Sequence, residues 1–95
     1  MIRSFKDKET ELVFLGEFSK KLPQAIQKMA LRKLIMLDDS LSINDLRVPP
    51  SNHLEQLKGD KKGLWSIRIN GQYRIIFKVN ENKSDYENVE IVDYH

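Results

Sequence analysis

Apolar residues in the first half of the chain recur at every third or fourth position. The clearest series is Ile26, Met29, Ala30, Leu34 and Leu37. This spacing places the side chains on one face of a helix, so it predicts a helix with an apolar stripe turned toward the core. Pro23 just before the series suits the first helical turn. The rest of the helix surface is expected to be basic, through Lys20, Lys21, Lys28, Arg32 and Lys33.

Two further elements are expected before this helix. The opening residues "MIRSF" alternate in character and predict a short strand. Asp7 is placed to cap a following helix, whose apolar positions would include Leu12, Leu15 and Phe18. The two helices should then form a helical hairpin.

Strand-like patterns dominate the second half. "LWSIRIN" (64–70) and "YRIIFKV" (73–79) are the clearest strands, joined around Asn70-Gly71. "HLEQLK" (53–58) and "NVEIVDY" (88–94) are expected to be strands as well. Helices followed by antiparallel strands indicate an α+β fold. We therefore expect one domain over residues 1–95, with an N-terminal strand and a helical hairpin packed on a twisted antiparallel sheet.

The loop between the two central strands decides what the sheet presents to solvent. A two-residue loop would place Arg74 and Lys78 on the same face as Trp65. A three-residue loop or a bulge would place Trp65 and the other large apolar residues of both strands on one face and the cations on the other. Because burial sets the register, we expect the odd loop. Arg68, Arg74 and Lys78 would then form a basic rail along a partly open sheet face.

Composition narrows the function classes. The chain has 95 residues, no cysteine and two histidines, which excludes a disulfide scaffold and disfavours a metal site. It has neither a membrane-length apolar run nor an apolar signal segment, so a cytoplasmic protein is expected. The net charge is only +2, but residues 47–78 hold seven Lys or Arg against two acids. This block predicts an anion-binding surface, although a merely solvated basic surface fits too.

The chain ends on Asp93, Tyr94 and His95. An imidazole titrates near neutral pH, and a nearby carboxylate can fix its tautomer. Together with cations that hold a phosphate, these groups are the parts of a metal-free ribonuclease. A base removes the ribose 2′-OH proton, the oxygen attacks phosphorus, and an acid protonates the leaving 5′-oxygen. The alternatives are an idle terminal histidine and an Arg74 that pairs with Asp93 for structure alone.

Several motifs together resemble one protein family. They are "LKGD", "WSIRIN" followed by "GQYRIIF", and the terminal "DYH", with "MIRSFKDKETE" at the start and a "KLP" helix matching as well. The combination resembles the HigB toxins, the plasmid-maintenance killer proteins of the RelE/ParE superfamily. The resemblance covers nearly the whole chain and implies a toxin held inactive by a HigA-type helix-turn-helix antitoxin. Free toxin would enter the ribosomal A site and cleave mRNA, and operator DNA would be bound indirectly, through the antitoxin.

The resemblance also implies roles for single residues. His95 would be the main acid or base, Asp93 would orient it or contact substrate, and Tyr94 would stack on a base or donate a hydrogen bond. Arg74 and Lys58 would stabilise the charged phosphorane, with no cofactor and no metal. The cations expected to bind RNA around them are Arg68, Lys78, Lys61 and Lys62.

One position departs from the family pattern. Some members carry a second histidine three residues before the Lys of "LKGD", where this chain has Glu55, with His53 two residues earlier. Glu55 or His53 is therefore a candidate for that role, and which group is base and which is acid stays open. Two other functions remain alternatives: a ParE-like poison of DNA gyrase, and a non-catalytic module of an operon-regulating complex.

Overall fold

The computed structural model describes residues 1–59, 63–82 and 84–94. It has the expected α+β order, helices first and an antiparallel sheet second. None of the helices in these ranges is long and apolar enough to cross a membrane. The elements are α1 (Lys8–Phe14), α2 (Gln24–Asp39), the 3₁₀ turns η1 (Ile43–Arg47) and η2 (Pro50–Asn52), and the strands β1 (Glu55–Gln56), β2 (Leu64–Arg68), β3 (Tyr73–Val79) and β4 (Tyr86–Asp93).

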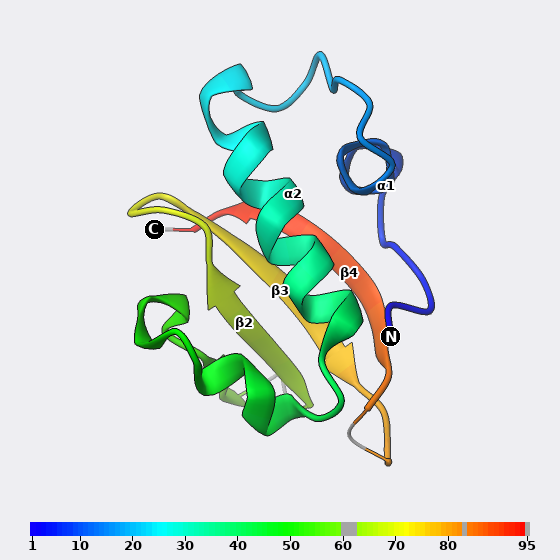
Figure 1. Ribbon diagram of the computed structural model, residues 1–95, viewed down its shortest axis with the longest axis vertical. Helices are drawn as coiled ribbons and strands as arrows, with labels where there is room; N and C mark the ends of the chain where they lie inside the picture. The colour runs from blue at the N-terminus through cyan, green and yellow to red at the C-terminus, as the bar shows by residue number, and fades with distance from the viewer. Residues whose placement is uncertain (60–62, 83, 95) are drawn as a thin grey trace.

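The four strands lie in sequence order, each antiparallel to its neighbour. Figure 1 shows α2 lying lengthwise across one face of the sheet, with α1 seen end-on near β4. The core lies between this face and α2. Ile67, Ile75 and Phe77 from the sheet are completely buried there, as are Ala30, Leu34 and Leu37 from α2.

The register of β2 and β3 confirms the odd loop. Trp65 pairs with Phe77 and Ile67 with Ile75, so the large apolar side chains share the helix-covered face. Arg68 pairs with Arg74 on the other face. The register of this hairpin was predictable because a shift by one residue would expose every buried side chain of one strand.

The N-terminal segment is less regular than predicted. Its backbone runs parallel to β4 but meets it only in isolated bridges at Ile2 and Phe5. β4 has a bulge at Asn88, whose φ is 53°. The bulge interrupts the edge of β4 along which a regular N-terminal strand would form its hydrogen bonds. Arg3 still fixes the segment through a 3.2 Å ion pair with Asp85.

The first helix begins as predicted and ends early. The Asp7 carboxylate accepts a hydrogen bond from the Thr10 backbone N–H at 2.7 Å, which confirms the cap. The helix stops at Phe14, however, and Leu15 and Phe18 are 63% and 57% exposed. The prediction that these two side chains lie on its buried face was wrong, because the helix has ended before it reaches them.

The second helix corrects the expected stripe at two positions. Met29 is exposed, whereas Lys33 is only 7% exposed. Lys33 lies seven residues after Ile26 and so faces the core. Its ammonium donates a hydrogen bond to the side-chain oxygen of Asn52, and burial lowers the pKa of the lysine. Asn52, itself fully buried, also donates to the Leu46 carbonyl at 3.1 Å and so ties η2 to η1 and α2.

Replacing Asn52 with alanine should therefore destabilise the fold. The variant would leave the Lys33 ammonium and the Leu46 carbonyl without these buried partners, at a cost of roughly 2–3 kcal/mol. Thermal unfolding should show a melting temperature lower by roughly 10 °C or more. Asn44→Ala, at an exposed position, is the matched control. Equal melting temperatures for the two variants would contradict this account.

Candidate active site

Arg74 is the central residue of the sheet face opposite the helices. Its side chain leaves β3 toward β1, where Nη1 lies 3.6 Å from Oε1 of Glu55. Its Nη2 donates a hydrogen bond to the backbone carbonyl of His53. The ring of Tyr94 lies over the guanidinium, with 5.5 Å between Cζ and the ring centroid. Two separate segments, residues 53–55 and the residue after β4, thus meet at one cation of β3.

The register of β4 separates the two terminal residues that the structure describes. Val92 pairs with Arg74, so Tyr94, two residues later, lies on the Arg74 face. Asp93 pairs with Tyr73 and lies on the other side of the strand, where its Oδ2 accepts a hydrogen bond from Gln72 at 3.1 Å. The structure therefore brings Tyr94, and not Asp93, against Arg74.

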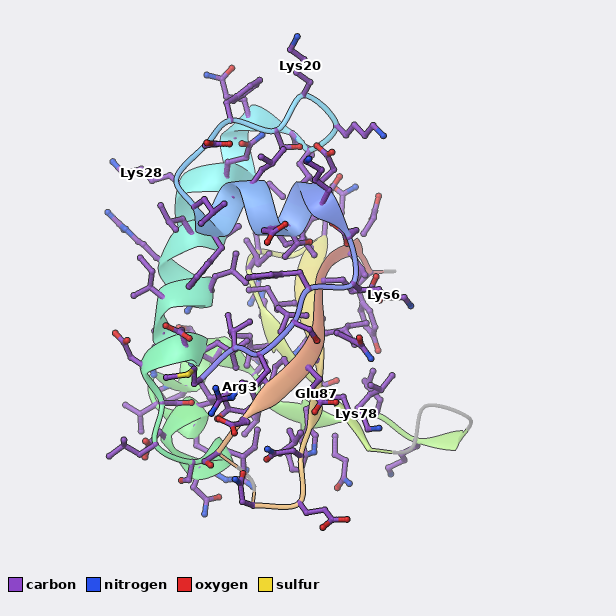
Figure 2. All side chains as sticks on the ribbon, turned by 90° about the vertical axis from the view of Figure 1, so that its right-hand side faces the viewer. Arg3, Lys6, Lys20, Lys28, Lys78 and Glu87 are labelled. Atoms are coloured by element: carbon purple, nitrogen blue, oxygen red, sulfur yellow. The ribbon has the colours of Figure 1, made fainter. Side chains whose placement is uncertain are left out.

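Exposure differs along the basic rail. Lys78 is exposed, Arg68 is partly buried, and Arg74 is only 9% exposed. Figure 2 shows Lys78 next to Glu87, its partner in the β3–β4 register. The expectation of an open face is confirmed at Lys78 and wrong at Arg74, because Glu55, Tyr94 and the His53 carbonyl lie against its guanidinium.

Lys58 lies apart from this cluster. It follows β1 at the end where Leu57 bonds to Leu64, whereas Arg74 pairs near the opposite end of β2. With a rise of about 3.3 Å per residue, three residues beyond Glu55 place its backbone about 10 Å farther along the sheet. Three other candidates, Lys61, Lys62 and His95, lie outside the described residues.

The contribution of His53 was not predictable from its side chain. His53 has a left-handed backbone, with a φ of 44°, and ends the turn η2. Histidine is among the residues that adopt this conformation more readily than most. The imidazole is on an exposed residue, while the carbonyl holds Arg74. The preceding Pro49-Pro50 pair indicated a turn here, but no sequence signal pointed to a backbone acceptor.

Two buried polar atoms on this face have no hydrogen-bond partner within the described ranges. They are Nε of Arg74 and Oγ of Ser66, and Ser66 is completely buried. Such atoms are rare in folded proteins and usually have a structural or functional reason. The Glu55 carboxylate is half exposed and lies 3.6 Å from Nη1 of Arg74. The arrangement thus suits a site in which Glu55 holds Arg74 in place while an anion binds the remaining donors of the guanidinium.

In the part of the chain that the structure describes, no group of three His, Cys, Asp or Glu side chains is placed to hold a metal ion.

Comparison with known families gives one match over almost the whole chain. The profile of a family described as the RelE-like toxin of type II toxin-antitoxin system HigB matches residues 3–95. The chain is 43% identical over 79 residues to Toxin HigB-1 of Vibrio cholerae, covering 82% of this chain and 83% of that protein. It is 32% identical to Endoribonuclease HigB of Proteus vulgaris over 95 residues, the full length of both.

A solved structure shares the fold. The chain is similar to a chain in the heterotetrameric YoeB-YefM toxin-antitoxin complex from Staphylococcus aureus, with a TM-score of 0.59 and 21% identity. The similarity covers 100% of this chain and 98% of the other. At this identity it supports the arrangement of two helices and a four-stranded sheet, and nothing more specific.

Proposed function

The chain belongs to the HigB-like family of RelE-type toxins, and from this premise we propose that it is a ribosome-dependent endoribonuclease that cleaves mRNA in the A site. A relative of the same length is named as an endoribonuclease, which supports the reaction class. The site of action would be the cytoplasm, where ribosomes translate.

The chemistry would use protein side chains alone. His95 would transfer a proton during attack of the ribose 2′-oxygen on phosphorus or during departure of the 5′-oxygen. Arg74 would stabilise the negative charge that develops on the phosphorane, and Lys58, whose backbone lies about 10 Å farther along the sheet, would have to reach it through its long side chain. Tyr94 would stack on a base or donate a hydrogen bond, and Asp93 would contact substrate or orient His95. Lys78 and Arg68, with Lys61 and Lys62, would hold the RNA strand.

One observation carries this proposal: Arg74 is held by Glu55, by Tyr94 and by the His53 carbonyl. The ring over Arg74 belongs to Tyr94, the residue before His95 in the sequence, which supports a shared role for Arg74 and the terminal residues. Glu55 stands next to Arg74 as the candidate for the complementary base, in the position of the family's second histidine.

Replacing Glu55 with glutamine should lower the rate of mRNA cleavage by about tenfold, because Arg74 would lose the charge that positions it. Single-turnover cleavage on programmed ribosomes measures the effect. Glu81→Gln, in the exposed β3–β4 turn, is the matched control. An unchanged rate would remove Glu55 from the mechanism. A fall far beyond tenfold, with loss of one limb of the pH–rate profile, would assign it the role of base instead.

A HigA-type helix-turn-helix antitoxin is the proposed partner, with operator DNA bound through it. The segment after α1 offers a surface for such a partner. Leu15 and Phe18 are exposed there, and Phe18 lines a groove of about 290 Å³ with Val13 and Leu31. Figure 2 shows Lys20 and Lys28 extending into solvent at this end of the molecule. Lys28 and Glu17 both line the groove, so its exposed apolar side chains are the main feature and fit a partner segment with apolar anchors.

Replacing Phe18 with serine should therefore weaken antitoxin binding by roughly tenfold or more. Cleavage by the free toxin should be unchanged, because the groove is on the helical side. Isothermal titration with the purified antitoxin measures the affinity. Leu41→Ser removes an 84% exposed leucine beyond the other end of α2 and is the control. Equal affinities for the two variants would place the contact elsewhere.

A gyrase poison and a non-catalytic module remain the competing functions. Purified protein added to a translation reaction separates the three, because only an endoribonuclease produces new mRNA ends on the ribosome. Intact mRNA together with gyrase-linked DNA breaks would favour the poison, and neither effect would favour the module.

A further inference from the structure

A second concave site lies on the opposite side of the sheet from Arg74. It is a cavity of about 410 Å³ between η1 and the edge of the sheet, within the usual size range of small-molecule sites. In Figure 1 the green segment after α2, which contains η1, passes beside β2. Trp65 and Val79 line the cavity from the sheet, and both lie on the face opposite Arg74. Val79 follows Arg74 by five residues, or about 16 Å along β3.

The lining combines three kinds of chemistry. Trp65, Val79 and Ile43 form an apolar and aromatic wall. Asn44, Gln56 and Asn80 bring amides, each of which can donate and accept hydrogen bonds. Arg47 adds a cation, and among the residues that the structure describes no acidic side chain lines the cavity. A metal ion or a basic peptide would need a carboxylate here.

The polar groups are partly fixed in place. Arg47 Nε donates to the Asn44 side-chain oxygen at 3.2 Å, which uses one of the five guanidinium donors and holds the group beside the cavity. The amide of Asn80 is held by Asp85: its side-chain oxygen accepts the Asp85 backbone N–H at 3.2 Å, and its side chain also hydrogen-bonds the Asp85 carboxylate. The amides left to meet a ligand are therefore those of Asn44 and Gln56.

We propose that this cavity binds one unpaired nucleotide of an RNA strand. An aromatic wall accepts a planar base, amides pair with base edges, and an arginine binds phosphate. A nucleotide offers a matching part to each of the three groups. The choice of RNA rests on the proposed function. The cavity would bind the RNA strand at a point distant from the cleaved bond. Changes in the cavity would therefore alter the affinity for substrate and not the chemical step.

Trp65 makes the site directly observable, because it is the only tryptophan in the chain. The experiment titrates the full-length protein with the four nucleoside monophosphates and with short single-stranded oligoribonucleotides, and follows Trp65 fluorescence against a free tryptophanamide reference. Saturable quenching is expected, with the oligoribonucleotides binding more tightly than the monophosphates. Arg47→Ala and Asn44→Ala, both at exposed positions, should each weaken binding by at least fivefold.

Arg32→Ala removes an equal charge from an exposed position on α2 and should leave the titration unchanged. Equal weakening by Arg32→Ala and Arg47→Ala would reduce the effect to nonspecific charge and overturn the proposal. Absence of quenching by any ligand would overturn it too, as would quenching by monophosphates alone, which would mean a free-nucleotide site.

Cleavage assays on the same samples keep the two proposals apart. A protein that cleaves mRNA without a Trp65 response refutes the cavity site alone. A Trp65 response in a protein that does not cleave refutes the endoribonuclease alone.

Discussion

Replacing His95 with alanine is expected to lower the rate of mRNA cleavage by roughly 10²–10⁴-fold, the usual contribution of a positioned proton-transfer group. The prediction rests on the chemistry of the imidazole and on the resemblance of the terminal motif to the HigB toxins. The structure adds that the preceding residue, Tyr94, lies against Arg74. Deleting only the last residue should have the same effect, because it removes the imidazole and leaves Tyr94 in place. Single-turnover cleavage on ribosomes measures both.

His53→Asn is the matched control for this experiment. His53 is the only other histidine, and asparagine tolerates its left-handed backbone. Because His53 meets Arg74 through its carbonyl, changing its imidazole should have a much smaller effect. Full activity of His95→Ala would remove the terminal imidazole from the mechanism. Loss of activity in His53→Asn alone would make His53 the working histidine.

Replacing Arg74 with lysine should lower the cleavage rate by roughly 10²-fold while the protein stays folded. Lysine keeps a positive charge but lacks the planar fork that contacts Glu55 and the His53 carbonyl at once and that binds phosphate through two donors. The rate and the melting temperature must be measured together, because Arg74 is buried and also links β3 to the segment before β1.

The control for Arg74 is Arg32→Lys, the same change at an exposed position on α2. A structural ion pair and a catalytic cation give different results. If Arg74→Lys cleaves at the wild-type rate but melts at a much lower temperature, the contacts of Arg74 serve the fold alone.

The pairing of the strands was predictable from the sequence where only one register buries the apolar side chains. The β2–β3 register followed from keeping Trp65, Ile67 and Ile75 on one face, and the structure has that register. The Asp7 cap was predictable for a similar reason, since a local side-chain acceptor satisfies a helix N–H that has no partner within the helix.

Contacts between distant segments were not predictable from local patterns. The helical spacing places Lys33 on the buried face, but the charge of a lysine favours an exposed position. Its partner Asn52 comes from a turn nineteen residues away in the chain, so no local pattern pointed to it. The burial of Arg74 has the same origin, because His53, Glu55 and Tyr94 reach it from other segments. Tyr94 could be assigned to the Arg74 face only once the β4 register, with its bulge before Val89, was known.

The most direct test maps mRNA ends in a reconstituted translation reaction that contains purified protein. The account predicts new 5′ ends that recur with codon periodicity on ribosome-bound mRNA, that require the ribosome, and that are lost in parallel in His95→Ala and Arg74→Lys. Intact mRNA with the wild-type protein at concentrations that arrest growth in cells would contradict it.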